Sequence, residues 1–227
     1  MASRIERITC RFAKARAMAG FTIIELLVAT LVFSVVMLII AIGVMQFNHA
    51  YYAGITQSNT QNTARAIVEN ISQAIQFSGE QVSSQITASG SEMGLCIGND
   101  RYSYRLGWQL VDGTPNTANH QTDHALVMDT PGNCSGMSAQ DFSKPLANGS
   151  TELLSTNMRI SNLSVTPLAG SDNLYKIDVR VVYGDDDLLR SPSGGGPTAS
   201  DVVCQAGSGS QFCAVSELST VVQRRIN

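Results

Sequence analysis

An apolar run near the N-terminus constrains this chain more than any other feature. It extends from Phe21 to Phe47 and contains a single charged residue, Glu25; the next Lys, Arg, Asp or Glu is Arg65. About 20 apolar residues are enough for a helix to cross a bilayer, so residues 26–45 can form such a helix. A carboxylate near the end of that segment is costly in hydrocarbon, and this cost points to a function for Glu25.

A basic segment precedes the apolar run. Residues 1–20 contain one acid, Glu6, against five bases: Arg4, Arg7, Arg11, Lys14 and Arg16. Positive charge before a spanning segment keeps that end of the chain in the cytoplasm. An ordinary secretory signal has its small cleavage-site residues after the apolar region, whereas here Ala19 and Gly20 come before it. Cleavage there removes the basic leader and leaves the apolar segment on the mature protein. A signal anchor that is never cut is the alternative, and it leaves Glu25 unexplained.

This junction resembles the type IV prepilin motif, with Gly20 before the cut, Phe21 after it and Glu25 four residues further on. The resemblance extends over residues 1–60. It implies a pilin-like subunit that a prepilin peptidase cuts after Gly20 and N-methylates on Phe21. It also implies that Glu25 acts in assembly, by meeting the amine of a neighbouring subunit and favouring one axial offset between helices. The alternative is an acid that only complements the helix dipole.

Four segments follow from the pattern and the resemblance. They are a cleaved leader at 1–20, a transmembrane and filament-core helix at 21–47, its amphipathic continuation at 48–79, and a β-rich globular domain at 80–227. In the continuation, apolar residues recur at spacings of three and four, which is typical of one helical stripe. Gly79 is expected to cap the helix C-terminus. The stripe consists of Ala64, Ile67, Val68, Ile71, Ala74 and Ile75.

The globular part is expected to be mostly strand. Residues 157–167 and 173–184 form the clearest pair, and residues 101–110, 124–129 and 215–226 are further strands. In 173–184, apolar residues from Tyr175 to Tyr183 alternate with more solvent-exposed residues, so one face of the strand is expected to pack on the helix. A long helix on an antiparallel sheet is an α+β arrangement, and the pilin resemblance implies the same fold. Residues 111–123 and 184–209 are predicted to be loops, the second a mobile surface loop.

Cysteine usage indicates an oxidising compartment. Cys10 leaves with the leader, and the remaining Cys96, Cys134, Cys204 and Cys213 allow three disulfide pairings. We favour Cys96–Cys134 with Cys204–Cys213, whose short Gly- and Ser-rich loop is like the C-terminal disulfide loop of many pilins. A zinc site is the competing interpretation, but the spacing contains no C-x-x-C pair. A catalytic cysteine is disfavoured because the pattern offers no histidine partner.

The charge of the mature chain limits its partners. Removing the leader leaves 10 Lys and Arg against 17 Asp and Glu, a formal charge of −7. An acidic exterior disfavours general nucleic-acid binding, which needs clustered bases. The pairs Arg101/Arg105 and Arg224/Arg225 still leave room for a small local patch at a filament tip.

Other chemical motifs are weak. Phosphate-binding, serine-hydrolase and zinc-protease motifs are absent from the sequence, so we expect no enzyme. Three consecutive acids with Asp201 beyond them offer oxygens to calcium, but the spacing of a calcium loop is missing, so no metal or cofactor is expected. The aromatics of 101–110 are predicted to pack in the core rather than bind carbohydrate. The residues concerned are Asp185, Asp186 and Asp187 for the acids, Tyr102, Tyr104 and Trp108 for the aromatics, and His49, His120 and His124, which are not expected to be ligands.

Two classes of function remain. The first is a minor structural subunit of a type IV pilus, or of a type II secretion or competence pseudopilus, of the W or J sort. Its partners are the prepilin peptidase, other pilin or pseudopilin subunits and the inner-membrane assembly platform. It sits as a single-pass protein in the bacterial inner membrane and then in a filament in the periplasm or at the cell surface. The second class is an adhesin or a DNA-binding receptor displayed at the filament tip.

Overall fold

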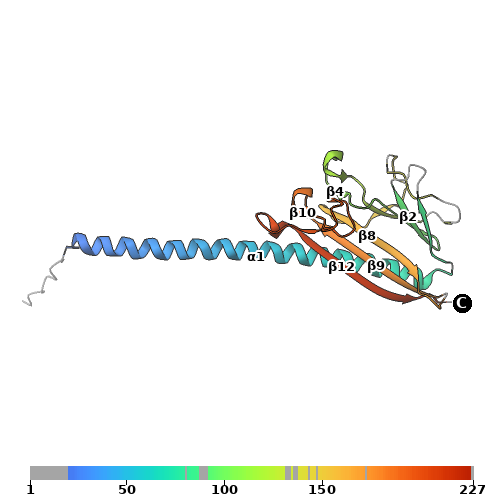
Figure 1. Cartoon of the computed structure of the whole chain (residues 1–227), viewed down its shortest axis with the longest axis horizontal. Helices are drawn as coiled ribbons and strands as arrows, with labels where there is room; N and C mark the ends of the chain where they lie inside the picture. The colour runs from blue at the N-terminus through green and yellow to red at the C-terminus, as the bar shows by residue number, and fades with distance from the viewer. Residues whose placement is uncertain are drawn as a thin grey trace, which may run out of the picture. The chain divides into compact units, whose positions relative to one another are not determined.

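The computed structural model describes residues 20–79, 81–86, 92–130, 134, 138–142, 144–146, 148–171 and 173–225. The chain divides into two compact units, Met1–Gln46 and Phe47–Asn227. Of the expected leader, residues 1–19 lie outside the described residues and Gly20 lies within them. The segment around residues 130–147 is described in part. The architecture is α+β: one long N-terminal helix with antiparallel sheets (Figure 1).

Helix α1 extends from Ile23 to Phe77. Its first half is built from Leu, Ile, Val, Met and Ala, and its second half carries the predicted apolar stripe. The buried positions are spaced by three and four residues, so they lie on one face: Thr56, Thr60, Ala64, Ile67, Ile71 and Ile75. The predicted C-cap at Gly79 is wrong. The helix ends at Phe77, and Gly79 does not take the left-handed φ that such a cap requires.

A three-stranded antiparallel sheet lies beside the second half of α1 (Figure 1). Its strand order is β12-β9-β8, with bounds Ala214–Gln223, Leu174–Tyr183 and Met158–Pro167. The alternation predicted for β9 is observed: Ile177, Val179 and Val181 are fully buried, and they share one core with Ile71 of α1. Period-two alternation therefore selects the face that packs on the helix.

A second antiparallel sheet has the order β1-β2-β3-β6-β7. It contributes Leu95, Ile97 and Tyr102 to the same core as α1 and β9. Because both sheets share that core, the larger core of the globular part includes the second half of the helix. The strands are β1 Ser83–Ile86, β2 Met93–Ile97, β3 Asp100–Tyr104, β6 Leu126–Asp129 and β7 Thr151–Glu152.

The single strand predicted over residues 101–110 is wrong. The chain breaks into β3 and a short β4, Gln109–Leu110, which pairs in parallel with β5, Gln121–Thr122. Gly107 makes the break, because its φ of 76° lies in the region that favours glycine. A Cβ at this position would lie 2.5 Å from the Cα of Thr198, so the close approach of the two backbones also requires glycine.

The segment 184–209 is folded rather than the predicted mobile loop. It contains the 3₁₀ turn η2, Asp186–Leu188, and the paired strands β10, Leu189–Arg190, and β11, Val203–Cys204. Leu189 and Val202 are buried with Val182 of β9 and Cys213 in a second, smaller core. Since Val182 follows Val181 in the strand, it points to the other face of the sheet. The segment therefore covers the face that α1 leaves open.

Candidate membrane and assembly site

The first turn of α1 contains a reciprocal capping arrangement between Thr22 and Glu25. The Thr22 backbone N–H and hydroxyl donate to Glu25 Oε2 at 3.0 and 2.8 Å, and the Glu25 N–H donates to Thr22 Oγ1 at 3.3 Å. This is the capping box expected of the pattern T-x-x-E at a helix N-terminus. Among the described residues, Glu25 Oε1 has no hydrogen-bond partner, so one carboxylate oxygen stays open to an incoming donor.

Gly20 and Phe21 lie immediately before this cap and are exposed. A Cβ built on Gly20 would meet nothing within 4 Å. The fold of the described chain therefore does not require glycine here, and any requirement for a small residue comes from outside the chain.

Every residue from Gly20 to Ala50 is exposed, including the large apolar side chains of α1. Among the described residues, α1 is the helix that is long and apolar enough to cross a membrane. Its polar side chains bond to their own helix: the Ser34 hydroxyl donates to Thr30 O at 2.8 Å, and that of Thr30 donates to Leu27 O at 3.0 Å. Such local bonding lets hydroxyls enter an apolar environment at low cost.

The two disulfides in the structure have the pairing favoured from the sequence. Cys96 is joined to Cys134, and Cys204 to Cys213. The first connects β2 to the segment after β6, and the second closes a loop that ends at β12. With their sulfurs joined in pairs, these four cysteines are not a zinc-ligand set in this fold.

The acidic run 185–187 serves a structural pairing that the sequence analysis missed. Arg159 on β8 is fully buried, and its guanidinium donates to Asp186 Oδ1 at 2.6 Å and to the carbonyls of Gly107 and Gly184. His120 Nδ1 lies 2.6 Å from Asp186 Oδ2. Because Asp186 balances the buried charge of Arg159, it helps to hold β8, η2 and the turn at Gly107 together.

Two further acids weighed for calcium, Asp185 and Asp201, are also hydrogen-bonded within the chain. Gln109 Nε2 donates to Asp185 Oδ1 at 2.8 Å. Hydrogen bonds from Ser191 and Ser193 lower the pKa of Asp201. Asp185, Asp186 and Asp187 line one pocket, but the described residues hold no group of three or more His, Cys, Asp or Glu side chains that could hold a metal ion.

The aromatic side chains of 101–110 separate into two environments. Tyr102 and Tyr104 are core residues, as predicted; their hydroxyls donate to Asn70 Oδ1 at 2.6 Å and to Leu163 O at 3.1 Å. Burial raises the pKa of Tyr104 to about 12 and that of Tyr102 further. Trp108 is only half-buried, and Arg105 lies over its ring at 4.7 Å. The prediction of a core position is therefore wrong for Trp108.

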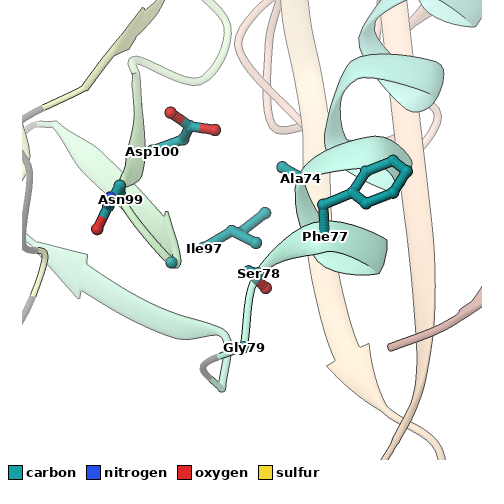
Figure 2. A pocket seen from close by; sticks show the side chains of 8 residues that line it. Ala74, Phe77, Ser78, Gly79, Ile97, Asn99 and Asp100 are labelled. Atoms are coloured by element: carbon teal, nitrogen blue, oxygen red, sulfur yellow. The ribbon is translucent and has the colours of Figure 1, made fainter. Parts of the chain in front are cut away.

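The described structure has a cavity of about 400 Å³ between the end of α1 and the β2–β3 turn (Figure 2). Figure 2 shows the ring of Phe77 pointing away from Asn99 and Asp100. The Asp100 carboxylate accepts a hydrogen bond from the Thr130 hydroxyl at 2.9 Å, so the acid at this cavity is engaged. The lining offers no convergent set of polar groups and carries no catalytic or binding assignment.

A row of exposed aromatic residues follows the apolar half of α1. Phe47, Tyr51 and Tyr52 lie on the helix, and Tyr52 contacts Phe212 from the Cys204–Cys213 loop. The helix residues are visible in the sequence, but Phe212 is not predictable as their neighbour because its position depends on the tertiary fold.

The chain matches no known family model, and neither curated proteins nor solved structures give a match.

Proposed function

We propose that this chain is a minor structural subunit of a type IV pilus, or of a type II secretion or competence pseudopilus. In this proposal the chain is inserted in the bacterial inner membrane with its N-terminus in the cytoplasm. Prepilin peptidase cuts it after Gly20 and N-methylates Phe21. The subunit then enters a filament through the first half of α1.

The geometry around Glu25 carries the proposal. The carboxylate heads an exposed apolar helix, where an unpaired charge is costly. Its Oε2 is held by Thr22, while its Oε1 has no partner among the described residues. Cleavage after Gly20 creates an amine on Phe21, and a neighbouring subunit can present that amine to Oε1. Opposite charges offset their desolvation only in close geometry, so the pair favours one axial offset between helices.

The globular unit supports a minor rather than a major subunit. Its loops are long, and the segment 184–209 adds a second layer with its own small core to one face of the sheet. Such bulk would crowd the repeating surface of a filament, whereas a subunit used once or rarely tolerates it. Two disulfides suit an exported domain.

The tip-displayed adhesin or DNA-binding receptor has less support. The bases proposed for a nucleic-acid patch are occupied within the chain: Arg101 pairs with Asp129 at 2.5 Å, and Arg105 pairs with Glu92. Arg225 lies over the ring of Phe77. Phosphate binding would have to displace these contacts.

Processing of the N-terminus tests the proposal. The full chain is co-expressed with a prepilin peptidase, and the intact mass of the membrane-bound product is measured. We expect loss of residues 1–20 and a methyl group on the amine of Phe21. Gly20→Val should retain the leader because a branched side chain blocks the peptidase subsite.

Gly43→Val is the matched control for this experiment. The substitution is the same, and a Cβ at Gly43 also meets nothing within 4 Å, but Gly43 lies inside the apolar segment. This variant should be cut and methylated normally. A wild-type product that starts at Met1, or a cut after the apolar segment, would contradict the proposed function.

A further inference from the structure

The exposed aromatic residues at the start of the second unit form a continuous surface, which we call the aromatic collar: Phe47, Tyr51, Tyr52 and Phe212. Successive ring centroids lie 6.2, 5.9 and 5.6 Å apart. All four side chains are exposed, from 44% for Phe212 to 69% for Phe47. Contiguous exposed apolar side chains mark interaction surfaces, so this collar is a candidate for one.

Phe212 is fixed in the collar by the surrounding chain. The Thr56 hydroxyl of α1 donates to Gln211 O at 3.2 Å, and Cys213 is joined to Cys204. The 3₁₀ turn η3, Ser210–Phe212, places the ring against Tyr52. The disulfide loop is thus seated on the helix at a defined position.

The collar begins where the apolar segment ends. Residues 26–45 of a helix cover about 30 Å, the thickness of the hydrocarbon layer. In sequence, Phe47 follows Met45 by two residues and Tyr52 follows it by seven. Helical side chains tilt toward the N-terminus, so the tyrosine rings lie over the preceding turn and closer to the apolar segment. Three of the four collar residues therefore follow the apolar segment directly in sequence, in the stretch where a chain that leaves the hydrocarbon meets the headgroups.

The chemistry of the collar suits the headgroup layer. Tyrosine has an apolar ring and a polar tip, and it is enriched at membrane interfaces. The helix carries no Lys, Arg, Asp or Glu between Glu25 and Arg65, and residues 205–212 of the disulfide loop are uncharged as well. Placing this surface among headgroups therefore desolvates no charged side chain.

We infer that the aromatic collar, including Phe212 of the Cys204–Cys213 loop, inserts into the outer headgroup layer of the membrane that α1 crosses. The partner surface is lipid. The inference rests on the membrane insertion in the proposed function, and it adds a second membrane contact from a part of the chain far from α1 in sequence. That contact orients the globular unit on the membrane before the subunit enters a filament.

Depth-dependent fluorescence quenching tests the inference. Single tryptophans replace Phe212, Leu168 or Phe33 in the full chain, reconstituted into phosphatidylcholine vesicles at no more than one chain per vesicle. The lipids carry bromine either near the headgroup or deep in the acyl chain. Trp108 is the natural tryptophan, and its contribution is subtracted with the parent protein. Thermal unfolding checks that each variant folds as the parent does.

Leu168→Trp is the matched control. Leu168 is 39% exposed, close to the value for Phe212. Its N–H donates to Leu174 O, and the neighbouring Asn173 O accepts from Arg224, next to Arg225, whose N–H donates to Gln76 O. Leu168 therefore lies near the C-terminal end of α1, and Gln76 is about 36 Å along the helix from Tyr52.

We expect several-fold stronger quenching of Phe212→Trp than of Leu168→Trp, and more from headgroup-proximal bromine than from deep bromine. Phe33→Trp should be quenched most by deep bromine, because Phe33 is inside the apolar segment. If Phe33→Trp is quenched but Phe212→Trp is quenched no more than Leu168→Trp, the collar does not contact lipid. This result overturns the inference and leaves a second subunit as the occupant of the collar. If Phe33→Trp is not quenched, membrane insertion fails and the inference fails with it.

Discussion

The two halves of α1 have similar backbones and opposite surroundings. Every residue from Ile23 to Gln46 is exposed, and the side-chain hydrogen bonds of Thr22, Thr30 and Ser34 stay within the same stretch of chain. From Thr56 onward one face is buried, and Asn70 bonds across to Tyr102 of β3. The first half is thus complete as a helix and exposed along its length, while the second half belongs to a core that the chain supplies itself.

The energetic consequence is that the two halves of the helix gain stabilisation from different surroundings. Burying a Leu, Ile or Val side chain contributes about 1.5–3 kcal/mol. In the second half that contribution comes from the sheets and stabilises the globular unit. In the proposed function, lipid or neighbouring subunits supply that contribution to the first half. Substitutions in the two halves should therefore act on different measurements.

The largest effect is expected at Glu25. In Glu25→Gln the amide oxygen can still accept from the Thr22 N–H and hydroxyl, so the cap is kept while the charge is lost. Under the proposed function, we expect Glu25→Gln to be inserted and cleaved but almost absent from filaments. The reason is that a neutral side chain cannot compensate the amine of the next subunit. Filament content is measured by immunoblotting of sheared or purified filaments.

Thr22→Val is the control for capping. It removes the hydroxyl that bonds Glu25 but keeps the carboxylate, at a cost of about 1 kcal/mol to the helix end. This variant should still enter filaments. Normal incorporation of Glu25→Gln together with loss of Thr22→Val would show that capping, and not charge, is the property required at Glu25. A subunit placed first at the tip would escape the requirement for an incoming amine.

A smaller effect, on a different measurement, is expected in the second half of α1. Ile71 is fully buried in the core shared with both sheets. Ile71→Ala should lower the free energy of unfolding of the globular unit by about 2–5 kcal/mol, from lost burial and the cavity left behind. Urea unfolding of the full chain in detergent, followed by near-ultraviolet circular dichroism, measures the change.

Leu38→Ala removes the same kind of side chain from the first half. Leu38 is 62% exposed, so the free energy of unfolding of the globular unit should not change. A loss of equal size in both variants would break the distinction between the two halves, because it would mean that the exposed half also stabilises the globular unit.

Local periodicity explains which elements could be predicted from the sequence. The stripe from Ala64 to Ile75 and the alternation in β9 place their buried faces correctly, because each pattern repeats within one element. The capping box also follows from the sequence, since Thr22 and Glu25 have the required spacing, whereas the prepilin resemblance concerns Glu25 alone. The β8 and β12 strands agree with their predicted ranges within a few residues at each end.

What the sequence could not predict depends on long-range partners. The break at Gly107 is required by the approach of Thr198, and the second core joins Val182 to Leu189 and Val202 through pairings that no local pattern encodes. For the same reason composition gave segment 184–209 as a mobile loop. The contact of Phe212 with Tyr52 spans most of the chain, so the aromatic collar emerges only in the folded protein.

The smallest predicted effect concerns pH, and it contrasts Glu25 of the first half with Glu152, a partly buried acid of the globular unit. Glu152 accepts backbone N–H bonds from Ala125 at 3.0 Å and from Leu126 at 2.8 Å. Burial nevertheless raises the pKa of Glu152 above its ordinary value of 4.5, and these bonds and the nearby His124 offset only part of the rise. The folded state therefore holds a proton that the unfolded state has released at the same pH.

The sign of the pH dependence follows from this proton. The stabilisation that Glu152 gives is fully present below pH 4.5 and is lost as the pH rises through the raised pKa. Relative to Glu152→Gln, the wild-type globular unit should become less stable from acid toward neutral pH, as measured by urea unfolding at a series of pH values. Asp178→Asn should give the opposite trend, because bonds from Ser219 and Lys176 lower the pKa of Asp178. Glu25→Gln should leave the profile unchanged, since Glu25 lies in the half of α1 outside the core. A wild-type advantage over Glu152→Gln that stays constant or grows toward neutral pH would show that the backbone bonds outweigh burial at this carboxylate.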